Sequence, residues 1–148
     1  MIERTANLDD RDLVLDLYKH LHESDEAFPE LEVLDSAWTQ LIDNELTHCF
    51  VIEDSGLLVC SCILSLTPNL TRGCRPFGLI ENVVTRAEHR RKGLGRRVIS
   101  NALEFAWEAN CYKVMLMTGR KDQAVYDFYA SCGFSGDEKR AFIARRKG

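Results

Sequence analysis

The sequence predicts a single-domain α/β protein in which helices pack on a mixed sheet. Its elements follow the order β-α-α-β-β-β-α-β-α-β, so three strands are adjacent in sequence before the first strand–helix–strand crossover. A regular doubly wound sheet does not have this order. The 148 residues fit one domain, spanning 1–148, that can bury one sizeable core. No repeat or linker interrupts them.

The first third of the chain predicts an edge strand and two helices. Residues 2–4 form a short strand at the sheet edge, and a polar loop over residues 22–32 separates the helices. Apolar residues recur at helical spacing in both helices. In the first these are Leu13, Leu17 and Leu21, with Asp9 or Asp10 as N-cap, and in the second Leu34, Ala37, Trp38, Leu41 and Ile42.

The pattern then changes to strands. Asp54-Ser55-Gly56 is a tight hairpin turn between two apolar, β-prone stretches. The predicted strands cover residues 49–52, 57–66, 77–85, 112–117 and 141–144, with a loop over residues 67–75. The remaining helices cover residues 94–110 and 123–132.

Composition narrows the function classes. The formal net charge of −4 does not favour nucleic acid as a partner. No apolar run reaches the roughly 20 residues that a membrane helix needs, and the start lacks the order of a signal peptide, so we expect a cytoplasmic protein. Five of the six cysteines lie in or beside apolar stretches and are interpreted as small buried hydrophobes, Cys74 lies in a loop, and we predict no metal site.

The segment joining the fourth strand to the third helix carries the chemical signal. It reads Arg90-Arg91-Lys92-Gly93-Leu94-Gly95. Two glycines remove side chains where the backbone would approach a ligand, and the helix start offers unpaired N–H groups to a pyrophosphate. The spacing is that of neither a P-loop nor a dinucleotide fingerprint. Taken alone, the motif is equally compatible with a glycine turn before a solvated basic helix.

Two elements resemble the GNAT N-acetyltransferases. Residues 90–95 are similar to their Arg/Gln-x-x-Gly-x-Gly/Ala element, and residues 128–134, Phe-Tyr-Ala-Ser-Cys-Gly-Phe, are similar to Phe-Tyr-x-x-x-Gly-Phe. The resemblance implies a GNAT-like fold, with a mixed, mostly antiparallel, twisted sheet of six to seven strands flanked by four helices. Within the superfamily, residues 79–84 resemble amino-sugar-phosphate acetyltransferases, but residues 68–78 resemble more a broad group of small bacterial members.

The resemblance implies acetyl-CoA as co-substrate and assigns residues to it. The fourth strand would separate from the fifth, its free backbone groups would bind the pantetheine arm, and the helix start would hold the pyrophosphate. The cofactor-binding residues implied are Val83, Val84, Thr85, Arg90, Arg91, Lys92, Gly93, Leu94, Gly95, Arg96 and Asp122. Asp122 departs from the asparagine that many members carry at that position.

Two side chains are candidates for catalysis. Tyr129 is the proposed acid, since a phenol is protonated at neutral pH and can donate to the departing thiolate. By itself the residue fits a core tyrosine better, and its position in the matching motif is what favours the acid. Glu81 is the proposed base, acting through a water, because a carboxylate inside an apolar strand needs a partner or a cavity. The alternative is a strand-edge glutamate paired with an arginine.

The acceptor is predicted to be a small-molecule primary amine. Glu23, Asp25 and Glu26 could attract the amine, while Arg72 and Arg75 could hold an anionic group. The alternative is that both are solvated charged loops. The alternatives are a non-catalytic acyl-CoA-binding module, a protein-amine acetyltransferase, and a covalent enzyme using Cys132. A homodimer is expected by analogy with the family.

Overall fold

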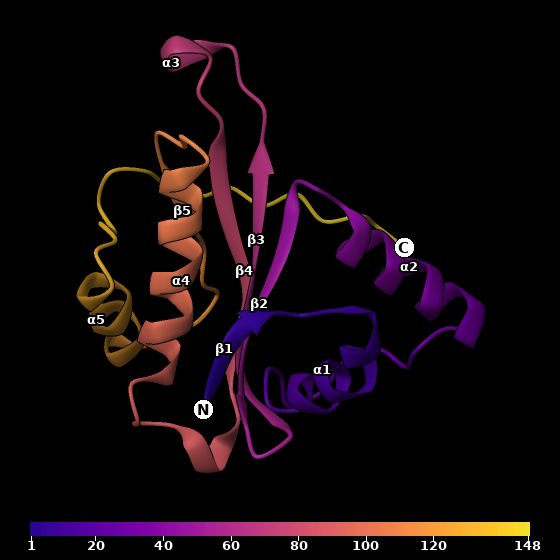
Figure 1. Cartoon of the computed structure of the whole chain (residues 1–148). Coiled ribbons are helices and arrows are strands. Elements are labelled where there is room, and N and C mark those ends of the chain that lie inside the picture. Colours follow the sequence, from indigo (N-terminus) through magenta and orange to yellow (C-terminus); the bar gives the residue numbers. More distant parts are fainter.

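The computed structural model describes residues 1–148 and contains one five-stranded sheet (Figure 1). Its strands lie in the order of the chain: β1 (Ile2–Thr5), β2 (Thr47–Asp54), β3 (Leu57–Thr67), β4 (Phe77–Thr85) and β5 (Val114–Leu116). The first three pairings are antiparallel, and only β4 and β5 are parallel. The predicted mixed, mostly antiparallel sheet is confirmed, with β1 at its edge.

Helices cover both faces of the sheet. Figure 1 shows α1 (Arg11–Tyr18) and α2 (Leu31–Asp43) on one face, with α4 (Leu94–Glu108) and α5 (Gln123–Ser131) on the other. A short helical turn, α3 (Thr71–Cys74), tips the long β3–β4 hairpin, and two 3₁₀ turns cover Leu8–Asp10 and Ala87–His89. None of the helices is long and apolar enough to cross a membrane.

Alternating residues of β2 supply two separate cores. Phe50 and Ile52 point toward α4, where they pack with Val98 and Ala102. Cys49 and Val51, one residue out of step, join the core under α1 together with Leu17. This period of two explains why the central strands read as continuous apolar runs, since both faces of the sheet are covered.

Local turn chemistry matches the sequence at the β2–β3 hairpin. Ser55 and Gly56 both have positive φ, 54° and 81°, as a two-residue hairpin turn of type I′ requires. At the start of α1 the N-cap residue is Asp10, one of the two predicted, although its side chain makes no capping bond to the helix; Asn7 caps the 3₁₀ turn that precedes it. Asn7 accepts a hydrogen bond from the N–H of Asp9, while its own N–H donates to the Asp10 carboxylate at 2.8 Å. Asp10 is thus the acidic partner within a capping box.

The predicted last strand does not form. Residues 138–148 contain no regular secondary structure, and Phe142 and Ile143 are 87% and 73% exposed. The sheet therefore has five strands, not six or seven. Four apolar residues favour an extended chain, but a strand exists only where a neighbouring edge supplies hydrogen bonds, and this segment meets none.

Candidate functional site

A backbone cradle precedes α4. Arg91 and Gly93 both adopt left-handed conformations, with φ of 61° and 77°, and Gly93 is the N-cap residue of the helix. The N–H groups of Arg91, Lys92 and Gly93 make no internal hydrogen bond, and the first bond closing the helix runs from Arg97 N–H to Gly93 O. The N–H groups of residues 94–96 lie in the first turn, which has no intrahelical acceptor. Residues 91–96 therefore present a run of donors suited to a polyanion.

The two glycines of this segment serve different ends. A β-carbon on Gly93 would meet nothing within 4 Å, so that position requires glycine for its left-handed φ and leaves the space above it open. A β-carbon on Gly95 would lie 3.0 Å from Cζ of Phe128 on α5. Gly95 is thus needed for packing between the helices, a role that the sequence alone did not indicate.

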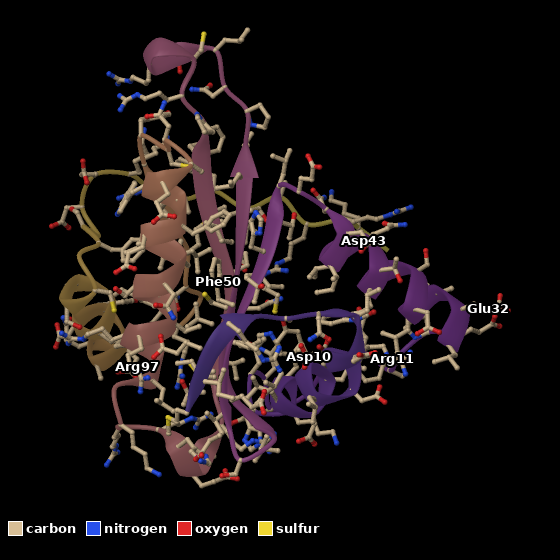
Figure 2. The ribbon with its side chains drawn as sticks, viewed as in Figure 1. Asp10, Arg11, Glu32, Asp43, Phe50 and Arg97 are labelled. Atoms are coloured by element: carbon tan, nitrogen blue, oxygen red, sulfur yellow. The ribbon has the colours of Figure 1, made fainter.

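Most of the basic side chains here already have protein partners. Arg90 donates to Thr85 O at 3.2 Å and to His20 O at 3.0 Å. Arg96 donates to Ser131 Oγ at 2.9 Å. Arg97, which lies near the start of α4 in Figure 2, pairs with Glu3 of β1. Arg91 and Lys92 alone among these five make no hydrogen bond or ion pair, so they are the cations free to meet an anion.

A buried arginine that sequence reasoning missed anchors this loop. Arg86 is 7% exposed and donates to Asp16 Oδ2 of α1 at 2.7 Å and to Leu58 O at 3.3 Å. The guanidinium holds the pKa of the partly exposed Asp16 carboxyl below its usual value. Nothing in the local sequence distinguishes Arg86 from its basic neighbours, because its partners lie 28 and 70 residues away.

Strand β4 separates from β5 directly before the cradle. The parallel pairing covers only Gly78, Leu79 and Ile80. Arg86 N–H donates to Val59 O on β3 at 2.8 Å, so by strand alternation the N–H groups of Val83 and Thr85 point away from β3, toward the open side. The N–H of Val84 points toward β3 instead. Its side chain is buried in the core under α1.

The candidate acid lies on α5. Tyr129 is half-buried, with ring centroids 5.2 Å from Phe128 and 6.4 Å from Phe134. Burial raises the pKa of its phenol, and the nearby negative charge of Glu81 acts in the same direction while Arg120 opposes it.

Glu81 and Asp122 have different surroundings. Glu81 lies on β4 beyond its pairing with β5, exposed to solvent and without an ion-pair partner, so the arginine-paired alternative is not observed. Asp122 is the N-cap of α5, and its carboxylate accepts from Ala124 N–H at 3.0 Å. This acidic residue does the capping work that asparagine would also do.

A pocket of about 640 Å³ opens beside the cradle. The end of α1 and the loop after it form one wall, Ala87 and Arg90 a second, and Arg120 a third. The lining residues are Lys19, His20, Leu21, His22, Glu23, Ser24, Ala87, Arg90 and Arg120. Arg72 and Arg75 are not among them. They lie on the β3–β4 hairpin, at the opposite end of β4 from the cradle.

Known proteins resemble this chain in sequence and fold. It matches the Acetyltransferase (GNAT) family over residues 12–134. A glucosamine 6-phosphate N-acetyltransferase from Trypanosoma brucei brucei is 35% identical over 95 residues, which cover 64% of this chain and 63% of the relative. A probable rice enzyme of the same name is 38% identical over 81 residues, 55% of this chain and 46% of the relative. The chain thus spans about half to two thirds of these curated relatives.

Solved structures match over nearly the whole length. A provisionally assigned acetyltransferase from Agrobacterium tumefaciens strain C58 is 40% identical with a TM-score of 0.92, covering 99% of this chain and 100% of that one. A Trypanosoma brucei acetyltransferase is 27% identical with a TM-score of 0.79, covering 97% and 99%.

Proposed function

Because the chain belongs to the acetyltransferase (GNAT) family, we propose that it transfers the acetyl group of acetyl-CoA to a primary amine of a small molecule, by direct attack through a tetrahedral intermediate. The observation that carries this proposal is the adjacency of two features. Strand β4 leaves β5 after Ile80, and a run of unpaired N–H donors at residues 91–96 follows within a few residues. Together they would offer the free backbone groups of β4 to an extended thioester and a run of N–H donors to its pyrophosphate.

The chain's own groups fit this co-substrate. The N–H groups of residues 91–96 would bind the pyrophosphate, with Arg91 and Lys92 supplying charge. The N–H groups of Val83 and Thr85 on the open side of β4 would bind the amide-rich pantetheine arm, and the Val83 N–H would polarise the thioester carbonyl. Leu94 contributes only its backbone, since its side chain is buried in the core.

The proton transfers have assigned residues. As the amine nitrogen bonds to the carbonyl carbon and the carbon–sulfur bond breaks, Tyr129 would give its proton to the thiolate. A phenol with the ordinary pKa of about 10 is protonated at neutral pH, and burial raises the pKa of Tyr129 further. Glu81 is exposed on the part of β4 that does not pair with β5, and it would accept the amine's proton through a water.

The acceptor would enter through the pocket beside Arg120. Its lining carries Lys19, Arg90 and Arg120 as cations and Glu23 as an anion. This charge distribution supports a small acceptor that bears both an amine and an anionic group, as does the likeness to glucosamine 6-phosphate N-acetyltransferases. The pocket replaces Arg72 and Arg75 as the site for the anionic group.

The experiment combines calorimetric titration of acetyl-CoA with a thiol-release assay on amines presented with and without a phosphate or carboxylate. Saturable turnover of an anionic amine, with a lower KM than its neutral counterpart, is the expected result. Cofactor binding without turnover of any amine would instead favour the non-catalytic acyl-CoA-binding module. Absence of cofactor binding would overturn the proposal. Light scattering on the same samples tests the expected homodimer.

A further inference from the structure

Helix α1 is held to the rest of the protein by an arginine at each of its ends. At its start, Arg4 of β1 donates to the Asp10 carboxylate at 2.6 and 2.9 Å. Near its end, Arg86 of the loop after β4 donates to Asp16 Oδ2 at 2.7 Å. The two ion pairs are similar in kind, but only the second lies beside the proposed acceptor pocket, whose lining begins at Lys19.

The imidazole of His20 links α1 to the same loop a second time. Its Nδ1 lies 3.3 Å from the backbone nitrogen of Ala87, and its Nε2 lies 3.4 Å from Nη1 of Arg86. A neutral imidazole has one acceptor nitrogen, so it can accept from only one of these two N–H groups. Whichever tautomer the ring adopts, it accepts a hydrogen bond from the loop.

Arg90 supplies a third link. Its guanidinium donates to His20 O at 3.0 Å and to Thr85 O at 3.2 Å, so one side chain joins the residues after α1 to the last residue of β4. The next residue along the chain, Arg91, begins the cradle. The loop of residues 86–90 and the end of α1 thus meet in one junction, which consists of these three sets of contacts.

The junction lies between two walls of the pocket of about 640 Å³. The end of α1 and the residues after it form one wall, and Ala87 and Arg90 form another. His20 of the first wall contacts both residues of the second, so the spacing of the walls depends on these contacts. Arg86 is 7% exposed and does not line the pocket, so its effect on an acceptor must pass through its contacts with the end of α1.

The loop of residues 86–90 also leads directly into the cradle. Its only regular structure is the 3₁₀ turn Ala87–His89, and the side chains of Glu88 and Arg90 are exposed, so contacts at its two ends determine where it lies. A polyanion held by the N–H groups of residues 91–96 would fix one end of the loop and, through the junction, the end of α1. Without the junction, the same polyanion would order the cradle alone.

We propose that Arg86 is a positioning residue that couples the two substrate sites: it holds Asp16 and His20 against the loop of residues 86–90, so that CoA bound at the cradle orders the acceptor pocket. The inference rests on the proposed function and deepens it. Arg86 touches neither substrate. The coupling is reciprocal, because a cofactor that raises the affinity for the amine is itself bound more tightly, by the same factor, when the amine is present.

Hydrogen–deuterium exchange with and without CoA tests the coupling in the absence of any acceptor. In the wild type, CoA should slow amide exchange about fivefold or more both at residues 91–96 and at residues 16–24. In Asp16→Asn, and in Arg86→Lys, which keeps the charge but loses the planar guanidinium, exchange should slow only at residues 91–96. Asp10→Asn is the matched control, because it weakens the ion pair at the other end of α1 and should keep both effects.

Binding and kinetics give a second measurement. CoA carries no acetyl group, so its Kd can be titrated without reaction in the presence of the amine that shows the highest turnover in the thiol-release panel. That amine should lower the Kd for CoA about fivefold in the wild type and should leave it within about twofold in R86K and D16N. In R86K the KM for the amine should rise about fivefold or more with kcat within about threefold, since no contact with a reacting atom is removed.

The outcomes separate the inference from the function it rests on. Protection of residues 16–24 by CoA in R86K and D16N would overturn the role of Arg86, and so would a wild type in which CoA protects residues 91–96 alone. Loss of that protection in D10N would overturn it as well, because α1 would then respond to either of its ion pairs. If R86K fails to fold, D16N decides the test, since Asp16 is partly exposed and asparagine has almost the same size. Absence of any protection by CoA in the wild type would remove the proposed function itself.

Discussion

Phe128 of α5 occupies the space that a side chain on Gly95 of α4 would need. Its Cζ lies 3.0 Å from the position of an ideal β-carbon on Gly95, and Thr85 Oγ1 lies 3.7 Å from that position. The two sequence elements that pointed to this family, at residues 90–95 and 128–134, therefore touch each other. Gly95 leaves space by lacking a side chain, and the Phe128 ring occupies that space. The cradle and the helix that carries Tyr129 therefore pack against each other.

Gly95→Ala should destabilise the protein by about 1–3 kcal/mol, because the added methyl group forces the Phe128 ring to move within a packed core. Urea unfolding measures the loss. Phe128→Leu in the same chain should recover part of it, since a smaller side chain makes room. If the loss of unfolding free energy in the double variant equals the sum of the losses in the two single variants, the two residues do not share this space.

Tyr129→Phe should lower kcat by at least about 100-fold while acetyl-CoA binding persists, because only the proton donor is removed. The matched control is Tyr126→Phe, which removes a hydroxyl three residues earlier on the same helix and should leave kcat unchanged. Similar rates for wild type and Y129F in the thiol-release assay would exclude the phenol as the acid.

The raised pKa of Tyr129 also predicts a pH dependence of stability. The phenol ionises more readily in the unfolded chain, at its usual pKa of about 10, than in the folded one. Stability should therefore fall as the pH rises above about 10, and Y129F should fall less steeply. Thermal melts between pH 8 and pH 11 test this, and parallel curves for both proteins would contradict it.

Arg91→Ala and Lys92→Ala should each weaken acetyl-CoA binding, and the double variant should reduce the dependence of the Kd on salt. Arg91 and Lys92 make no ion pair or hydrogen bond within the protein, so no internal partner competes with a bound anion. Arg97→Ala is the control: it breaks the contacts with Glu3 and should affect stability more than affinity. A larger loss of affinity in R97A than in R91A would reverse this assignment.

Asp10→Asn should destabilise the protein at neutral pH by about 2 kcal/mol, since the carboxylate completes the capping box and accepts two hydrogen bonds from Arg4. Figure 2 shows Asp10 at the start of α1, beside β1. Arg4 lowers the pKa of Asp10 below its usual value, so this stability is present above the unfolded pKa of about 3.9 and is lost as the pH falls through the folded value. Urea titrations at pH 7 and pH 3 should show the difference between the two proteins shrinking in acid.

Local patterns predicted most of the elements. The Asp54-Ser55-Gly56 turn, the strand over residues 77–85 and the start of α4 at Leu94 all occur where the sequence places them. Each depends on short-range information: positive φ at a glycine, a run of β-branched residues, or apolar spacing along a helix. The cradle at residues 91–96 belongs to this class, since its glycine and its unpaired helix N–H groups are features of one contiguous segment.

The sequence by itself thus determined the order of the elements up to α5, the family and the glycine-containing loop before α4. The tertiary structure alone decided which cations stay free, which glycine serves packing, and which N–H groups of β4 face the open side. It also decided that residues 141–144 remain outside the sheet. The physical reason is the same in each case: the position and role of a side chain or strand depend on the partner that it contacts. Here those partners, such as Glu3 for Arg97 and Phe128 for Gly95, lie dozens of residues away in the chain.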